Sequence, residues 1–154
     1  MTVTSQSVLI KNGTLPDGSK KDVLIADGVI TSVASGLSSD SPAFDATGMI
    51  VMAGLVDLHT HLREPGREDS ETVLSGSRAG VKGGYVALSA MANTSPVADT
   101  AGVVEQVYRL GQSAGLLDVF PIGAVTQGIA GKVLAELGAM ADSEARVRVF
   151  SDDE

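Results

Sequence analysis

The chain has 154 residues, with 11 Lys and Arg against 19 Asp and Glu, which gives a net charge of −8 when both His are neutral. A chain this acidic lacks the positive surface that nucleic-acid backbones and anionic membranes attract. The absence of Cys excludes disulfides, thiolate metal sites and a Cys nucleophile. The sequence shows no secretory signal and no apolar run near the roughly 20 residues of a membrane helix, so we expect a cytoplasmic globular protein.

The N-terminal part of the chain predicts short strands and no helix. Apolar runs at Val8–Ile10, Val23–Ala26 and Val29–Val33 are bounded by turn residues. The dipeptide Asp27-Gly28 predicts a tight hairpin between the second and third runs, since both turn residues must adopt positive φ. We therefore predict a separate β unit over residues 1–52.

The remainder, residues 53–154, alternates apolar runs with amphipathic stretches, which predicts a parallel α/β unit. Four parallel strands with three intervening helices would form the first half of a (β/α)₈ barrel, and an open doubly wound sheet is the alternative. The expected elements, in chain order, are a strand ending at His61, a helix over Ser70–Val81, a strand over Tyr85–Met91, a helix capped by Asp99, a strand over Val119–Val125, a helix around Val133–Met140 and a strand over Val147–Phe150.

Both His residues of the chain lie at the carboxyl end of the first strand of this α/β unit. Strict alternation of side chains along that strand would place Asp57, His59 and His61 on one face. The carboxyl ends of barrel strands are where active sites lie, and paired imidazoles there suit a divalent metal ion such as Zn²⁺. The pair by itself also fits two solvated histidines at a strand end.

Three segments together resemble the strand-end motifs of the dihydroorotase family, in the amidohydrolase superfamily. They are Gly54–Gly66, which ends in His-Thr-His-Leu-Arg-Glu-Pro-Gly, then Met91–Asp99, and Phe150–Asp153. The similarity covers essentially the whole chain. It implies strands one to four of an amidohydrolase-type (β/α)₈ TIM barrel, preceded by a small N-terminal β-sandwich segment.

The resemblance also implies a metal site that holds Zn²⁺. His59 and His61 would bind the more buried metal ion, and Asp153 would bridge two ions, as in the bacterial type whose bridging ligand is a carboxylate. Asp152 is the neighbouring alternative, because strand alternation allows only one of the two carboxylates to face the centre of the pocket.

Two further residues acquire substrate-binding roles from the resemblance. Arg63 would hold the substrate carboxylate, which a planar guanidinium can meet in a bidentate pair. Asn93 would make a second substrate contact through an amide that both donates and accepts. We expect the general base and the remaining metal-binding His residues to lie beyond Glu154, and the chain alone to be inactive.

The implied activity is zinc-dependent, reversible hydrolysis of L-dihydroorotate to N-carbamoyl-L-aspartate in pyrimidine biosynthesis. One alternative is another cyclic-amide hydrolase, such as a hydantoinase, dihydropyrimidinase or allantoinase, although Arg63 favours a substrate that carries a carboxylate. A second alternative is a non-catalytic subunit that scaffolds aspartate transcarbamoylase. The expected partners are the small-molecule substrate, further copies of the chain, and aspartate transcarbamoylase.

Overall fold

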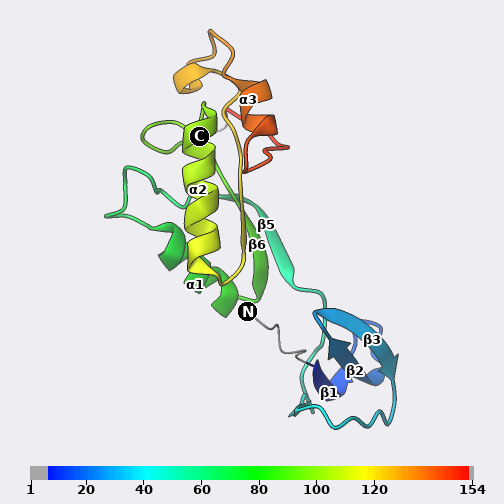
Figure 1. The fold of residues 1–154 in the computed structure, drawn as a ribbon. Helices are drawn as coiled ribbons and strands as arrows, with labels where there is room; N and C mark the ends of the chain where they lie inside the picture. The colour runs from blue at the N-terminus through cyan, green and yellow to red at the C-terminus, as the bar shows by residue number, and fades with distance from the viewer. Residues whose placement is uncertain (1–6, 153–154) are drawn as a thin grey trace. The chain divides into compact units, whose positions relative to one another are not determined.

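The computed structural model describes residues 7–152 (Figure 1). The chain divides into two compact units, residues 1–53 and 54–154, and each unit is described by itself. None of the helices among residues 7–152 has the length and apolar character of a membrane span.

The first unit contains a four-stranded sheet in the order β3-β2-β1-β4. Its strands are β1 (Ser7–Thr14), β2 (Lys20–Ala26), β3 (Val29–Ala34) and β4 (Ala43–Asp45). The predicted hairpin between β2 and β3 is confirmed, with φ of 52° at Asp27 and 76° at Gly28. The described residues of this unit form this one sheet, so the predicted β-sandwich is not confirmed.

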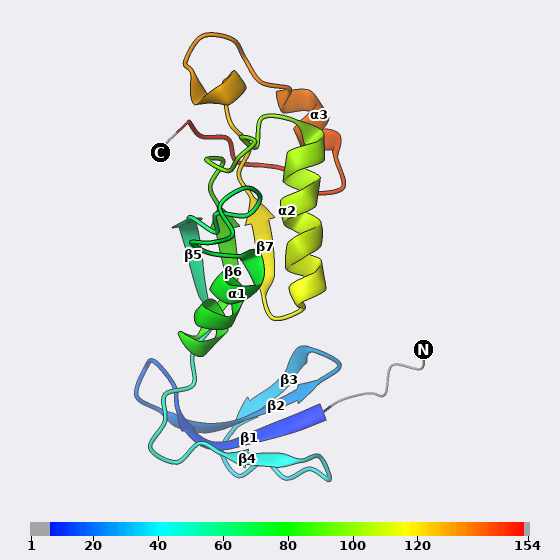
Figure 2. The ribbon, with the colours of Figure 1, turned by 90° about the vertical axis from the view of Figure 1, so that its left-hand side faces the viewer.

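The second unit contains a three-stranded parallel sheet in the order β5-β6-β7. Figure 2 shows the three strands side by side. The predicted alternation of strand and helix is confirmed as far as β7. The elements are β5 (Leu55–Thr60), α1 (Val73–Lys82), β6 (Tyr85–Ala90), α2 (Ala101–Ala114), β7 (Asp118–Pro121), the 3₁₀ turn η1 (Gln127–Ile129) and α3 (Leu137–Asp142).

One face of this sheet is covered by α1 and α2 (Figure 1). Val73 of α1 and Val107 of α2 are buried together with Leu88 of β6 and Val119 of β7. The opposite face has much less cover, since Phe120 at the centre of β7 is 52% exposed. The helical layer therefore fixes the strands, and with them the loops at their carboxyl ends.

The ends of α1 follow local sequence signals. Thr72 is the N-cap, and it exchanges hydrogen bonds with Ser75 in a capping box. The helix ends at Lys82 with Gly83 as its C-cap, and Gly84 follows with φ of 87°, as the Gly-Gly pair predicts. The predicted cap of α2 was wrong by one residue, since Thr100 is the N-cap. The carboxylate of Asp99 instead accepts a hydrogen bond from Gly128 N at 2.8 Å.

The third predicted helix is shorter than expected. Val133 and Leu134 are exposed and lie outside α3, which begins at Leu137. Gly128, Ile129 and Gly131 all have positive φ, which a right-handed helix cannot contain. The segment before α3 therefore folds as a loop, which the spacing of its apolar residues did not predict.

The predicted fourth strand, Val147–Phe150, is reduced to one parallel bridge between Gly123 and Phe150. The amide of Ile122 donates to a carbonyl of β6. Because backbone N–H groups alternate in direction along a strand, the backbone nitrogens of Pro121 and Gly123 point away from β6, to the opposite edge of β7. Pro121 has no N–H to offer there, and pairing begins only at Gly123, whose amide donates to Val149 O at 3.1 Å. Among the described residues, a half-barrel of four strands is therefore not confirmed.

Candidate active site

The carboxyl ends of β5 and β6 bring together two of the loops that carry predicted site residues. Met91 N donates to Thr60 O at 2.8 Å, which continues the pairing past the ends of both strands. Immediately beyond, the ring nitrogen Nδ1 of His61 lies 3.0 Å from Oδ1 of Asn93. Two of the predicted site residues, 32 positions apart in the sequence, are thus in direct contact.

A β-bulge near the end of β5 changes the predicted alternation. Asp57 and Thr60 pair with Leu88 and Ala90, so β5 has one more residue than β6 between the two pairs. Since Leu88 and Ala90 pack under the helices, Asp57 and Thr60 lie on that covered face. The prediction that Asp57 shares a face with His59 by strict alternation was wrong, and Asp57 Oδ1 instead accepts from His59 N at 3.0 Å.

The two histidines form a close pair at this end of the sheet. Their ring centroids are 5.1 Å apart, and the ring planes meet at 67°. His59 is exposed and His61 is half-buried, so both rings lie near the surface of the described unit. Two imidazoles at this separation fit a divalent metal ion as part of a ligand set.

Further ligands for such an ion are not present in the part of the chain that the structure describes. Within residues 7–152, no group of three or more His, Asp or Glu side chains is placed to hold a metal ion. Asp153, the predicted bridging ligand, lies outside the described residues. His59 and His61 are therefore a fitting but partial donor set.

Asp152, the alternative bridging residue, is held by the loop that follows β7. Its carboxylate accepts hydrogen bonds from Val125 N at 2.8 Å, Thr126 N at 3.0 Å and the Thr126 hydroxyl at 2.6 Å. These donors lower the pKa of Asp152, and the Thr126 hydroxyl has the largest effect. The carboxylate thus has a structural role in closing this loop.

Arg63 lies in a tight turn directly after the two histidines. Its φ is 59°, and Glu64 N donates across it to Leu62 O at 2.8 Å. The side chain of Glu64 then accepts a hydrogen bond from Val73 N, the first residue of α1, at 2.7 Å. Sequence analysis missed this anchoring role of Glu64, and the only signal available was an acidic residue before a predicted helix.

The loops after β5 and β6 are also fastened to each other. Ser95 N donates to Pro65 O at 2.9 Å. Gly66 packs so closely on Ser95 that a Cβ at this position would meet the Ser95 carbonyl oxygen, and its φ is 98°. The loop that carries Arg63 and the loop that carries Asn93 therefore form one fixed assembly, with a glycine required at the point of contact.

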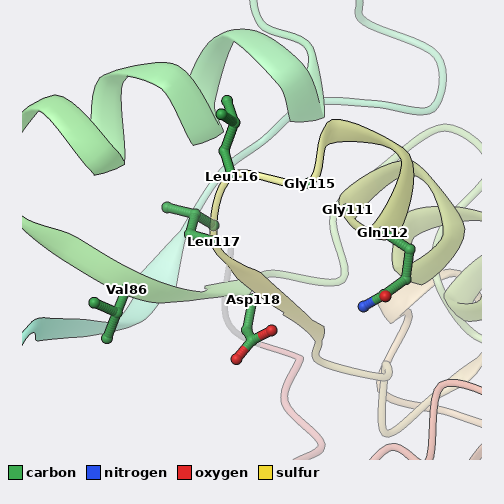
Figure 3. A pocket seen from close by; sticks show the side chains of 7 residues that line it. All are labelled: Val86, Gly111, Gln112, Gly115, Leu116, Leu117 and Asp118. Carbon is green, nitrogen blue, oxygen red and sulfur yellow. The ribbon is translucent and has the colours of Figure 1, made fainter. Parts of the chain in front are cut away.

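Several hollows border the described part of this unit. One, of about 280 Å³, lies between β5 and α1 and includes Asp57, His61 and Glu71 among its lining residues. Another, of about 310 Å³, lies where β7 begins, at the opposite end of the sheet from the histidines. Figure 3 shows this second hollow, which is lined by Val86, Gly111, Gln112, Gly115, Leu116, Leu117 and Asp118. Of these two hollows, the first adjoins a predicted site residue, His61.

Comparison with known proteins gives matches along almost the whole chain. Residues 48–154 match the family model described as dihydro-orotase-like. The dihydroorotase of Streptomyces coelicolor is 60% identical over 94% of this chain, and that of Leifsonia xyli subsp. xyli is 59% identical over 98%. These matches cover 34% and 35% of the two relatives, so the chain spans about a third of their length.

Solved structures share the fold at lower identity. The L-hydantoinase (dihydropyrimidinase) from Arthrobacter aurescens has a TM-score of 0.68 and 22% identity, covering 82% of this chain and 29% of its own. An adenine deaminase has a TM-score of 0.61 and 24% identity, covering 79% of this chain and 31% of its own. The described α/β unit thus shares its fold with part of each of these two enzymes.

Proposed function

We propose that this chain, which belongs to the dihydro-orotase-like family, supplies the N-terminal part of a cytoplasmic dihydroorotase. The reaction is reversible hydrolysis of L-dihydroorotate: water cleaves the C–N bond of the ring amide, which yields the new carboxylate and the ureido N–H of N-carbamoyl-L-aspartate. The relatives named dihydroorotase, 42% to 60% identical over at least 94% of this chain, support the assignment.

The observation that carries the proposal is the contact between His61 and Asn93. A predicted metal ligand and a predicted substrate-binding residue lie 3.0 Å apart at the carboxyl ends of adjacent parallel strands. The Arg63 loop is fastened to the same place through Ser95 and Pro65. Residues for the metal ion and for the substrate are therefore within reach of one another, as a single active site requires.

His59, His61 and Asp153 would hold Zn²⁺. A bound divalent ion in such a site would activate water and polarise the carbonyl of the ring amide. The engagement of Asp152 by Val125 and Thr126 supports Asp153 as the bridging residue, because the carboxylate of Asp152 is already committed to three donors.

Arg63 would bind the substrate carboxylate through its guanidinium, and Asn93 would donate to it from Nδ2. This pairing favours dihydroorotate over hydantoins and dihydropyrimidines, since most of those cyclic amides lack the carboxylate. The general base is expected beyond Glu154, so activity requires more than these 154 residues.

The test is a chimera that joins these 154 residues to the part of the Streptomyces coelicolor relative that follows its matched region. We expect the chimera to consume dihydroorotate in a zinc-dependent reaction that His59→Ala abolishes. The unaltered relative serves as the positive control, and circular dichroism checks folding. Preference for hydantoin or dihydrouracil would support the alternative hydrolases, and a folded chimera inactive on all three substrates would support the non-catalytic subunit.

A further inference from the structure

We infer that Asn93 is a positioning residue for His61, whose ring it holds with the proton on Nδ1 and the lone pair on Nε2. The inference rests on the proposed function in one respect, namely that His61 is a metal ligand. It adds a role for Asn93 that is separate from substrate binding, and it assigns Nε2 as the metal-binding nitrogen.

The chemistry of the two atoms determines the direction of the hydrogen bond. An amide oxygen only accepts, so the contact of 3.0 Å between His61 Nδ1 and Asn93 Oδ1 requires the imidazole to donate. A neutral imidazole carries one N–H, and its other nitrogen then has a free lone pair. Hydrogen bonds of this kind from ligating histidines fix the tautomer and the ring orientation.

Asn93 is held in place by the turn that surrounds it. Ala92 is fully buried, and its carbonyl accepts from Thr94 N at 2.9 Å and from Ala98 N at 3.0 Å. Ser95, two residues after Asn93, donates from its amide to Pro65 O of the neighbouring loop. The amide of Asn93 is therefore presented from a backbone with little freedom to move.

His61 is held from the other side. Thr60 is anchored through its hydroxyl, which donates to Ser89 O at 2.9 Å, and Leu62 is buried in the core under the helices. The contact between His61 and Asn93 thus joins two fixed segments, and such a contact can select one tautomer reproducibly.

The same contact restricts what Asn93 can offer a substrate. Because one lone pair of its oxygen accepts from His61, Asn93 offers a ligand chiefly its two Nδ2 protons, which suit an acceptor such as a carboxylate. Asn93→Asp separates the two roles. It keeps an acceptor for His61, but it replaces the donor with a negative charge that repels the substrate carboxylate.

The first test reads the tautomer directly in the 154-residue protein without metal or substrate. Ring ¹⁵N chemical shifts of His61 are measured by NMR in alkaline solution, so that the neutral ring is observed. We expect the Nδ1–H form in the wild type and in Asn93→Asp, and a mixture of both forms in Asn93→Ala. Ser95→Ala, an exposed change in the same turn, is the matched control and should match the wild type.

The second test is zinc affinity of the same variants by calorimetric titration. We expect Asn93→Ala to weaken binding about 10- to 100-fold, and Asn93→Asp to restore it. An Nε2–H tautomer in the wild type, or equal losses of zinc affinity in both Asn93 variants, would overturn the inference. If Asn93→Ala does not fold, the His61 tautomer in the wild type and the zinc affinity of Asn93→Asp still test the inference.

Neither readout involves substrate, so the inference and the proposed function fail separately. An inactive chimera with the expected tautomer and affinity changes would reject the proposed reaction alone. An active chimera whose His61 tautomer is indifferent to Asn93 would reject the positioning role alone. In an active chimera, we further expect Asn93→Asp to raise KM for dihydroorotate at least tenfold.

Discussion

Thr126 holds the carboxylate of Asp152 with both its backbone and its side chain. Its amide donates to Oδ1 at 3.0 Å, and its hydroxyl donates to Oδ2 at 2.6 Å. The bonds connect the last described residue of the chain to the loop after β7. They therefore hold in place the residue that precedes Asp153, the proposed metal ligand.

The first prediction concerns this pair and pH. The pKa of Asp152 is lowered in the folded state, chiefly by the hydrogen bond from the Thr126 hydroxyl. The ionised carboxylate therefore stabilises the fold at pH values above the pKa that Asp152 has in the unfolded chain. This stabilisation is lost as the pH falls through the pKa of Asp152 in the folded protein. We expect Asp152→Asn to lower the urea midpoint at pH 6 more than at pH 2.5. Thr126→Val should have a smaller effect of the same sign, and equal losses at both pH values would contradict the prediction.

The second prediction concerns the N-cap of α1. Thr72 Oγ1 accepts from Ser75 N at 3.0 Å, whereas Thr100, the N-cap of α2, makes no side-chain cap bond. Thr72→Ala should cost about 1 kcal/mol of unfolding free energy. Thr100→Ala is the matched control and should cost less than half as much. Urea unfolding measures both, and similar costs would show that the capping box is not the cause.

The third prediction compares two glycines in α2. A Cβ on Gly111 would lie 2.6 Å from Val119 Cβ, whereas a Cβ on Gly102 would meet nothing within 4 Å. We expect Gly111→Ala to destabilise the protein by about 1–3 kcal/mol through overpacking. Gly102→Ala should instead be neutral or stabilising by up to about 1 kcal/mol. Thermal unfolding measures the stability of both variants. Gly111→Ala should be the less stable of the two, because α2 packs closely on β7.

The fourth prediction concerns Arg63. In the chimera, Arg63→Lys should raise KM for dihydroorotate about 10- to 100-fold, because an ammonium group cannot reproduce a bidentate pair with a carboxylate. Lys adopts a φ of 59° as readily as Arg does, so the substitution should leave the backbone of the turn unchanged. Steady-state kinetics measure KM, and an unchanged value would remove Arg63 from the substrate site.

The fifth prediction concerns association of the 154-residue chain. β5 and β7 are both edges of the parallel sheet, and Phe120 on the less covered face is 52% exposed. Unpaired edges and apolar surface favour contact with further chains. We expect light scattering after size exclusion to show oligomers that Phe120→Ser reduces. A monodisperse monomer with one cooperative urea transition would contradict this expectation.

Local signals in the sequence predicted local structure well. Asp27 and Gly28 determine the hairpin between β2 and β3, because few other residues tolerate two successive positive φ values. The Gly83-Gly84 pair determines where α1 ends. β4, in contrast, was not predicted, since its three residues are defined by parallel pairing with β1 across a distance in sequence.

The sequence by itself determined the family, the order of the main strands and helices, and the residue types at the strand ends, since each depends on short motifs or on periodicity. Only the tertiary structure decided that a bulge moves Asp57 to the helical face, that Pro121 delays pairing with the last segment, and that Asp152 is used by Thr126. It also decided that His61 contacts Asn93. These features depend on which backbone donors and acceptors meet across loops, and spacing along the chain does not encode that information.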